Sequence, residues 1–240
     1  ASEDDTVVAS GTTTGVEDGQ TVTVVFTDGS NATVTATTTV STNAWTLTGS
    51  EADISGLDNG TITITANVSD VAGNAASQAS KTITLDNVAP SAPSNAIDLA
   101  DGSDAGGSNS DNKTNDTTPT VRVDLTGTNA VAGDTLELLL GGASLSSAVT
   151  KTLDSTDISN AYVDLTTGAD LGSDGDKVFT AKVTDVAGNI GSAGGSLTVT
   201  LDTTAPTGLT IAGTLEVDNI VNASEDDTVV ASGTTTGVED

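Results

Sequence analysis

Branched apolar residues alternate with polar residues along much of this chain, and this period of two restricts the fold more than any other feature. The alternation runs through residues 20–29, 31–40, 60–70, 81–86, 118–125, 134–140, 177–185 and 195–202. Asp-Gly, Asn-Gly and Gly-Gly pairs interrupt it. Such alternation between turn signals is typical of half-buried antiparallel strands. No stretch shows a helical period with capping residues, so we expect an all-β protein.

The spacing of these strands indicates how they pack. Turn signals recur about every 8–12 residues within units of about 100 residues, as in immunoglobulin-like sandwiches. Only 2% of the residues are aromatic, so the core must consist of Val, Ile, Leu, Ala and Thr methyl groups, most of which favour strands. We expect tandem immunoglobulin-like β-sandwiches joined end to end, with Trp45, Tyr162 and Phe179 as core residues.

Two internal repeats define the organisation of the chain. Residues 1–18 return without change at 223–240, an offset of 223 − 1 = 222 residues. A looser repeat relates "VSDVAGN" to "VTDVAGN" and "LDNVAP" to "LDTTAP", with spacings of 185 − 70 = 115 and 202 − 86 = 116 residues. Two homologous domains therefore alternate within the longer period, and we expect the chain to be a window cut from a longer protein.

The domain boundaries are predicted at the dipeptides Ala89-Pro90 and Ala205-Pro206, because proline cannot donate to a strand ladder and holds its predecessor in an extended conformation. Residues 1–89 then form an immunoglobulin-like domain that lacks its first strand, and residues 90–205 form a second domain. Residues 206–240 carry the first strands of a third. A lone two-stranded fragment is marginal in water, so we expect residues 207–222 to lie against the open edge of another copy's first domain.

The composition excludes several classes of function. The chain has no Cys and no His, which excludes Ser/His/Asp triads, Cys/His pairs and His-ligated metal sites. No apolar run reaches the ~20 residues that cross a bilayer. The net charge is −28, from 34 acidic and 6 basic residues, and this charge repels nucleic acid and anionic membranes. A divalent cation, above all Ca²⁺, is the better partner.

The most acidic stretch is 98–120, "DLADGSDAGGSNSDNKTNDTTPT". Its carboxylates repel one another in the absence of a cation, and Ca²⁺ accepts six to eight carboxylate, amide and carbonyl oxygens. A solvated loop or a salt-adapted surface is the alternative interpretation. Neither the EF-hand pattern nor the nonapeptide calcium repeat occurs, so a calcium site here must combine several loops. The candidate ligands of this stretch are Asp98, Asp101, Asp104, Asp111 and Asp116.

The topology of a seven-stranded sandwich predicts which other carboxylates meet. One pole of the first domain holds Glu3, Asp4, Asp58 and Asp86, and it faces the loop of Asp185 in the second domain. The far pole of the second domain combines the acidic stretch with Asp174, Asp176 and Asp202. Salt adaptation would spread carboxylates over the strand faces. Their concentration at the junctions therefore favours calcium.

These motifs resemble the bacterial immunoglobulin-like repeats of very large secreted adhesins, of the repeats-in-toxin and biofilm-associated type. The resemblance rests on "DGSN" with a later Trp, on "DNGTITITANVSDVAGN", "LDNVAP", "DNKTNDTTPT", "LDTTAP" and "VDNIVNASED". It covers nearly the whole chain. "VDNIV" departs from the family's more common "DNVI", but the Asp is kept.

The resemblance implies extracellular extender domains, strung between an anchor in the bacterial cell surface and a distal ligand-binding region, with calcium stiffening the junctions. It implies these interdomain ligands: Asp86 and Asp202 at strand ends, Asp70 and Asp185 in the "AGN" loops, Asp58 and Asp174 in turns, and Asp218, Asn222 and Glu225, with Glu3, in the "DNIVNASED" region.

Two other functions are alternatives to a spacer. An adhesive module that contacts a glycan or a surface directly would need an aromatic platform or a flat array of Thr on one face. An enzyme that cleaves glycosidic bonds would need a carboxylate pair beside aromatic or basic residues that hold the sugar, and the chain has few of either. We therefore expect a non-enzymatic spacer. It should contact neighbouring repeats of its own chain and be a monomer with end-to-end contacts between copies.

Overall fold

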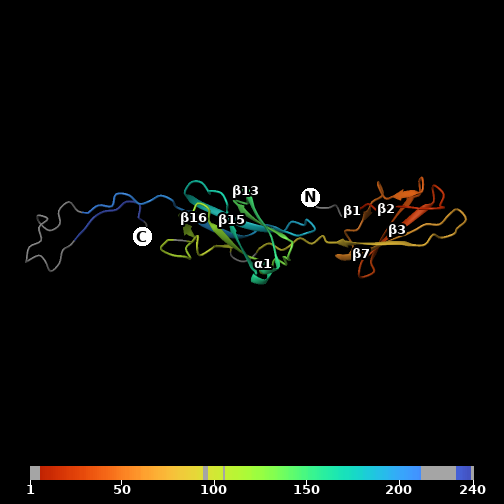
Figure 1. The fold of residues 1–240 in the computed structure, drawn as a ribbon, viewed down its shortest axis with the longest axis horizontal. Helices are drawn as coiled ribbons and strands as arrows, with labels where there is room; N and C mark the ends of the chain where they lie inside the picture. Colours follow the sequence, from red (N-terminus) through yellow and green to blue (C-terminus); the bar gives the residue numbers. More distant parts are fainter. Residues whose placement is uncertain (1–5, 94–96, 105, 212–230, 239–240) are drawn as a thin grey trace, which may run out of the picture.

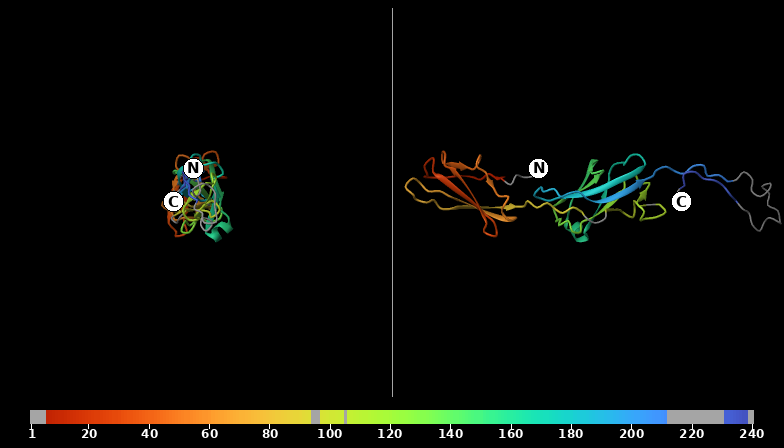
Figure 2. Two further views of the ribbon diagram at one scale, coloured as in Figure 1. Left: turned by 90° about the vertical axis from the view of Figure 1, so that its left-hand side faces the viewer. Right: turned by 180° about the vertical axis from the view of Figure 1, so that it is seen from behind.

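A computed structural model describes residues 6–93, 97–104, 106–211 and 231–238 of the chain. These residues form two β-sandwiches that lie end to end, followed by an extended tail (Figure 1). Seen along the long axis, the two sandwiches overlap (Figure 2). Each has its own apolar core. The predicted all-β fold of tandem immunoglobulin-like sandwiches is confirmed.

The first sandwich consists of short strands around one larger sheet. Its strands are β1 (Thr6–Val7), β2 (Ser10–Thr12), β3 (Thr21–Thr27), β4 (Thr33–Thr39), β5 (Ala44–Thr46), β6 (Ala52–Asp53), β7 (Gly60–Asn67) and β8 (Ala79–Leu85). The larger sheet has the order β4-β3-β7-β8, and the opposite layer consists of the pairs β1-β6 and β2-β5. Strand β8 is therefore an edge strand.

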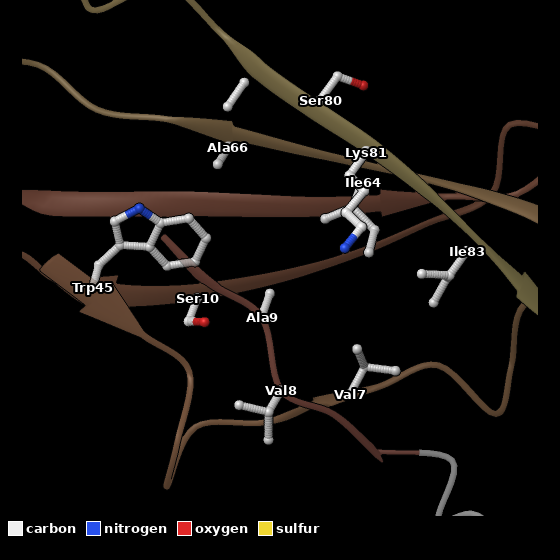
Figure 3. A pocket seen from close by; sticks show the side chains of 11 residues that line it. Val7, Val8, Ala9, Ser10, Trp45, Ile64, Ala66, Ser80, Lys81 and Ile83 are labelled. Atoms are coloured by element: carbon white, nitrogen blue, oxygen red, sulfur yellow. The ribbon is translucent and has the colours of Figure 1, made fainter. Parts of the chain in front are cut away.

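The period of two in the sequence builds the core of this sandwich. In β3 the inward residues Val22, Val24 and Phe26 are all buried, while Thr23 and Val25 between them face the other side of the sheet. Trp45 of β5 is partly buried and packs on the same core. The predicted role of Trp45 as a core residue holds on its inner side only, because its outer side lines a groove together with Val8 and Ile83 (Figure 3).

The second sandwich is larger and more completely closed. Its elements are β9 (Ile97–Leu99), β10 (Lys113–Thr114), β11 (Thr120–Asp124), β12 (Thr135–Leu140), β13 (Ala143–Thr152), α1 (Ser155–Asn160), β14 (Tyr162–Thr166), β15 (Gly175–Thr184) and β16 (Gly194–Leu201). The sheets have the orders β10-β16-β15-β12-β13 and β14-β11-β9. All pairs are antiparallel except β10 with β16, which is parallel.

The aromatic residues of the second sandwich have different environments. Phe179 is fully buried among Leu136, Leu138 and other aliphatic side chains, as predicted. The prediction for Tyr162 was wrong, because this residue is 37% exposed. Its ring lies 4.2 Å from the guanidinium carbon of Arg122. A cation over an aromatic face is favourable at the surface, and this contact holds Tyr162 outside the core.

The short helix α1 is not predicted by the sequence pattern. Asp154 caps its first turn, since the carboxylate accepts hydrogen bonds from the backbone N–H groups of Thr156 and Asp157, and Asp157 in turn accepts one from the N–H of Asp154. Such a capping box satisfies N–H groups that the first turn leaves open. Ala161 ends the helix in a left-handed conformation. A helix of six residues is too short to show a hydrophobic period.

Candidate functional site

The linker between the sandwiches is anchored to the second one. Pro90 and Pro93 are buried, and the N–H of Ser91 donates to the carbonyl of Thr128 at 2.9 Å. Two glycines make room for this packing. A Cβ on Gly191 would lie 2.5 Å from the carbonyl oxygen of Pro90, and one on Gly194 would lie 2.5 Å from that of Pro93. The freely exposed linker is thus reduced to residues 86–89.

One side chain connects the two sandwiches directly. The Nδ2 group of Asn189, in the loop between β15 and β16, donates to the carbonyl of Asp86 at 2.9 Å. The same group donates to the Asp185 carboxylate at 2.8 Å, and that carboxylate also accepts from the backbone N–H of Asn189. Gly188 has a positive φ in this turn. The "TDVAGN" loop therefore presents an amide in a fixed orientation to the end of β8.

The "SDVAGN" loop of the first sandwich repeats this geometry. Asn74 donates from its backbone and from Nδ2 to the carboxylate of Asp70, both at 2.8 Å. These bonds, those of the Asn74 side chain first, lower the pKa of Asp70. The loop lies at the end of the first sandwich that points away from the second (Figure 1). It lies between the last two strands of its sandwich, as the Asn189 loop does in the second sandwich.

The junction pole of the first sandwich gathers the ends of neighbouring strands. Asp58 precedes β7 and Asp86 follows β8, and these strands are paired through Gly60 and Leu85. A carboxylate missed in the sequence analysis, Asp28, lies beside them, because it accepts a hydrogen bond from the N–H of Asp58 at 2.9 Å. This bond is the main cause that lowers the pKa of Asp28. The Asp-Gly after β3 was interpreted as a turn signal alone.

The far pole of the second sandwich contains the other predicted strand-end carboxylates. Asp174 accepts hydrogen bonds from the hydroxyls of Thr203 and Thr204 at 2.7 and 2.6 Å. These contacts, that of Thr204 first, lower the pKa of Asp174. Asp202 accepts from the N–H of Thr204 at 2.9 Å, and Asp176 accepts from the hydroxyl of Thr200. The residues around the second Ala-Pro dipeptide are thus held against the turn before β15.

The acidic stretch folds around Asp104, which is only 2% exposed. Burial raises the pKa of Asp104, and repulsion from Asp111 and Asp98 raises it further. Asp116 lies on the other side of the stretch, where the Ser103 hydroxyl donates to it at 2.9 Å. The carboxylate of Asp104 therefore has an environment that disfavours its charge.

Two buried oxygens in this stretch have no hydrogen-bond partner: Oδ1 of Asp104 and Oδ1 of Asn112. The N–H of Asn112 is 3.4 Å from the other oxygen of Asp104, so the two residues are neighbours. An unpaired buried oxygen costs about 1–3 kcal/mol, and Ca²⁺ binds carboxylate and amide oxygens. The donor set thus fits calcium. Within the four described ranges, however, no three Asp or Glu side chains approach closely enough to hold a metal ion.

The structure brings some of the predicted site residues together and separates others. Asp58 and Asp86 share the junction pole with the loop of Asp185. Asp174 and Asp202 share the far pole, and Asp98, Asp104 and Asp111 are neighbours within the acidic stretch. Asp101 is exposed in a turn of that stretch. Glu3, Asp4, Asp218, Asn222 and Glu225 lie outside the described residues.

Sequence reasoning missed the amides Asn189 and Asn112 because it searched for charge. A signal was available, since Asn189 closes the repeated "DVAGN" motif and Asn112 follows Asp111 in "DNKT". The motif alone did not show which residue reaches the neighbouring domain. In the part of the chain that the structure describes, no helix is long and apolar enough to cross a membrane.

Comparison with known proteins finds one family match, which lies on the second sandwich. Residues 91–203 match the family model of the bacterial Ig-like domain. The search of curated proteins found no match. Among solved structures, the chain is similar to a tetra-tandem repeat in the extending region of a large adhesion protein, with 28% identity and a TM-score of 0.34; the match covers 98% of this chain and 53% of that one. The chain thus spans about half the length of this structure.

Two further structures are similar to this chain. A structure concerning host cell surface retention of a 1.5-MDa bacterial ice-binding adhesin has 26% identity and a TM-score of 0.40, over 97% of this chain and 69% of that one. Fibronectin(III)-like modules of CbhA from Clostridium thermocellum have 10% identity and a TM-score of 0.40, over 82% and 85%. The family match and the sandwich topology agree over residues 91–203, the part of the chain that is similar to the bacterial Ig-like domain.

Proposed function

We propose that this chain is a structural extender segment of a large bacterial cell-surface adhesin. Its domains would be joined end to end outside the cell and would hold a distal ligand-binding region away from the surface. The observation that carries the proposal is the junction between the sandwiches. The linker packs against the second sandwich, and Asn189 donates a hydrogen bond to Asp86 of the first. The two sandwiches lie along one axis (Figure 1).

The repetition of this junction supports a spacer. The Asp70 loop has the same hydrogen bonds as the Asp185 loop, so each sandwich carries the same connecting device at the same pole. An array with a period of 222 residues can therefore be extended by repeating one contact. A bacterial Ig-like domain is a structural module and not an enzyme, which agrees with the absence of His and Cys from the sequence.

Calcium is the second part of the proposal. The supporting observation is the buried carboxylate of Asp104. One of its oxygens has no hydrogen-bond partner, and burial raises its pKa, so the ionised form is disfavoured. Asp104, Asp111 and Asn112 would hold the ion, which would neutralise this charge and fix the acidic stretch at the pole that precedes the next domain. At the junction itself, Asp58, Asp86 and Asp185 with Glu3 would provide the ligands, next to a hydrogen bond that needs no metal.

The calcium proposal can be tested by thermal unfolding in calcium, in equimolar magnesium and in excess chelator, at fixed ionic strength. Dedicated sites predict a rise in the melting temperature with calcium that magnesium does not reproduce. Asp104→Asn should abolish most of this rise, while the matched exposed substitution Asp170→Asn should keep it. Equal effects of both ions, or an unchanged calcium effect in Asp104→Asn, would contradict the proposal.

The spacer itself has a separate test, since stiffness can be measured without calcium. Small-angle X-ray scattering of the chain should give a maximum dimension that corresponds to two aligned sandwiches, and this dimension should persist over a range of salt concentrations. A freely hinged pair would give a broader distribution with shorter distances. That result would contradict the extender proposal even if calcium binds.

One observation favours a second candidate function, a module that binds a regular surface directly. The outer face of the larger sheet in the first sandwich is rich in threonine, and one row across its four strands consists of Thr33, Thr27, Thr63 and Thr82 in direct register. Pull-down on insoluble polysaccharides and on ice would test it. Loss of binding when Thr27 and Thr63 are replaced by Lys would support this function, and failure to bind would leave the spacer alone.

A further inference from the structure

The chain enters and leaves the second sandwich at opposite poles. It enters through the linker that follows β8, and β16 runs directly into the exit segment at Asp202. The two poles lie at the two ends of this sandwich along the long axis of the molecule (Figure 1). A pull on the two ends of the chain therefore stretches the sandwich along that axis.

The entering chain lies beside the start of β16 and runs in the same direction. Pro90 packs against Gly191, and Pro93 packs against Gly194. Residue numbers thus increase together in the two segments, so the segments are parallel. Two parallel segments are drawn past each other when the ends of the chain are pulled apart.

Strand β10 makes the direct connection between the entering chain and the leaving strand. The N–H groups of Thr200 and Asp202 donate to the carbonyls of Asn112 and Thr114, both at 2.9 Å. We call these two segments, 112–114 and 200–202, the β10–β16 clamp. Among the strand pairs of the described residues, it is the only one that joins one of the first two strands of the second sandwich to its last strand.

Tension loads the two bonds of the clamp at the same time. A pull on the exit segment draws β16 toward the far pole, while a pull on the linker, passed on through β9 and the acidic stretch, draws β10 toward the junction. Because the bonds of a parallel pair are evenly spaced along the strands, the strands slide past each other and both bonds must break in one step. Strands that are separated from one end break their bonds one after another, at a lower force.

The clamp is shielded from water. Leu201 is fully buried, Val199 before it is also fully buried, and Thr114 is 3% exposed. A hydrogen bond is stronger in such a medium of low dielectric constant than in water. The buried side chains thus raise the force that the two bonds resist.

We propose that the β10–β16 clamp is the element by which the second sandwich withstands tension along the chain. A segment that connects a cell surface to a bound ligand is pulled at both ends, so the source of the tension rests on the proposed extender function. The resistance itself follows from strand order and can be measured without an adhesin. A freely hinged junction in solution scattering would contradict the extender and leave the clamp intact, whereas a weak clamp would leave the alignment of the sandwiches unchanged.

Single-molecule force spectroscopy of the full chain tests the direction of the force. The chain has no Cys, so handles can be attached at chosen exposed residues. Asn87→Cys with Ala205→Cys pulls the second sandwich along its axis, whereas Asn115→Cys with Ala205→Cys opens the clamp from one end. We expect about twofold higher force along the axis at the same loading rate, because two bonds break together rather than in turn. Equal forces, or a lower force along the axis, would overturn the proposal.

Two variants separate the clamp from overall stability. Thr200→Pro removes one bond of the clamp, because proline has no N–H to donate to Asn112. The matched control is Val149→Ala, which removes core packing on β13, at the other edge of the same sheet. Denaturant unfolding gives the stability lost in each variant, whereas forced unfolding depends on the unfolding rate.

Thr200→Pro should lower the axial force to that of opening from one end, and Val149→Ala should keep the wild-type axial force despite its lower stability. If both variants lowered the axial force in proportion to the stability lost, overall stability would resist the tension and the proposal would be wrong. If Thr200→Pro did not fold, the two pulling directions in the chain with native Thr200 would still decide.

Discussion

Replacing Asn189 with Ala removes the one side-chain hydrogen bond that the described residues form between the sandwiches. The Nδ2 group of Asn189 donates at 2.9 Å to the carbonyl of Asp86. The net value of such a bond is about 0.5–1.5 kcal/mol. At 25 °C this energy corresponds to a rise of about two- to twelvefold in the ratio of undocked to docked junctions. Because the contact is solvent-exposed, we expect the lower half of that range.

The first sandwich provides a matched control. Asn74→Ala removes the same bond within the loop, from Nδ2 to the neighbouring Asp carboxylate, but no bond to another domain in the described part of the chain. Both substitutions should therefore lower the stability of their own loops equally. Only Asn189→Ala should change the orientation of one sandwich relative to the other.

Pulsed electron spin resonance can measure this difference. The chain has no Cys, so spin labels can be placed on Thr35→Cys and Thr150→Cys, both exposed and on different sandwiches. Asn189→Ala should broaden the distance distribution between the labels, and Asn74→Ala should leave it as in the wild type. If both variants gave the wild-type distribution, the buried linker alone would hold the junction and the role assigned to Asn189 would be wrong.

Three further predictions concern the linker and the carboxylates. Gly191→Ala should destabilise the second sandwich by about 1–3 kcal/mol, a typical cost of overpacking, because the added Cβ would lie 2.5 Å from the carbonyl oxygen of Pro90. Denaturant unfolding measures this loss. Gly29→Ala should show no such loss, because the space around Gly29 is open. Without calcium, Asp104→Asn should raise the melting temperature at pH 7. The pKa of Asp104 is raised in the folded protein, so its ionised form opposes folding once the pH exceeds the ordinary value of 3.8. An unchanged melting temperature would show that the charge is already compensated. The pKa of Asp174 is lowered in the folded protein, so its ionised form stabilises the fold above pH 3.8, and this stabilisation is lost as the pH falls below that value. The acid-induced loss of stability, measured by unfolding at pH 2 to 5, should therefore be smaller in Asp174→Asn. An identical pH profile would refute the role of its bonds to Thr203 and Thr204.

The sequence predicted the strands well because their signal is local. In β3, β7, β15 and β16, successive side chains face opposite sides of the sheet, so the position of a residue in the alternating pattern predicts whether it faces the core. The turn residues mark where each strand ends. The repeated "DVAGN" and "LD…AP" motifs likewise predict that Asp86 and Asp185 lie at opposite sides of one junction. The residues of the junction could be found in this way because repeats and topology together restrict where loops lie.

Tertiary structure decided the rest, because it depends on contacts between residues distant in the chain. Pro90 packs against Gly191, and Asn189 donates to Asp86, only when the two sheets have formed and the linker is packed against the second sandwich. The burial of Asp104 distinguishes it from Asp101, although the two differ little in sequence context. The groove beside Trp45 is likewise a property of strand order. The sequence by itself thus determined the strands, the repeats and the acidic poles, whereas only the packing of distant segments decided which polar groups pair.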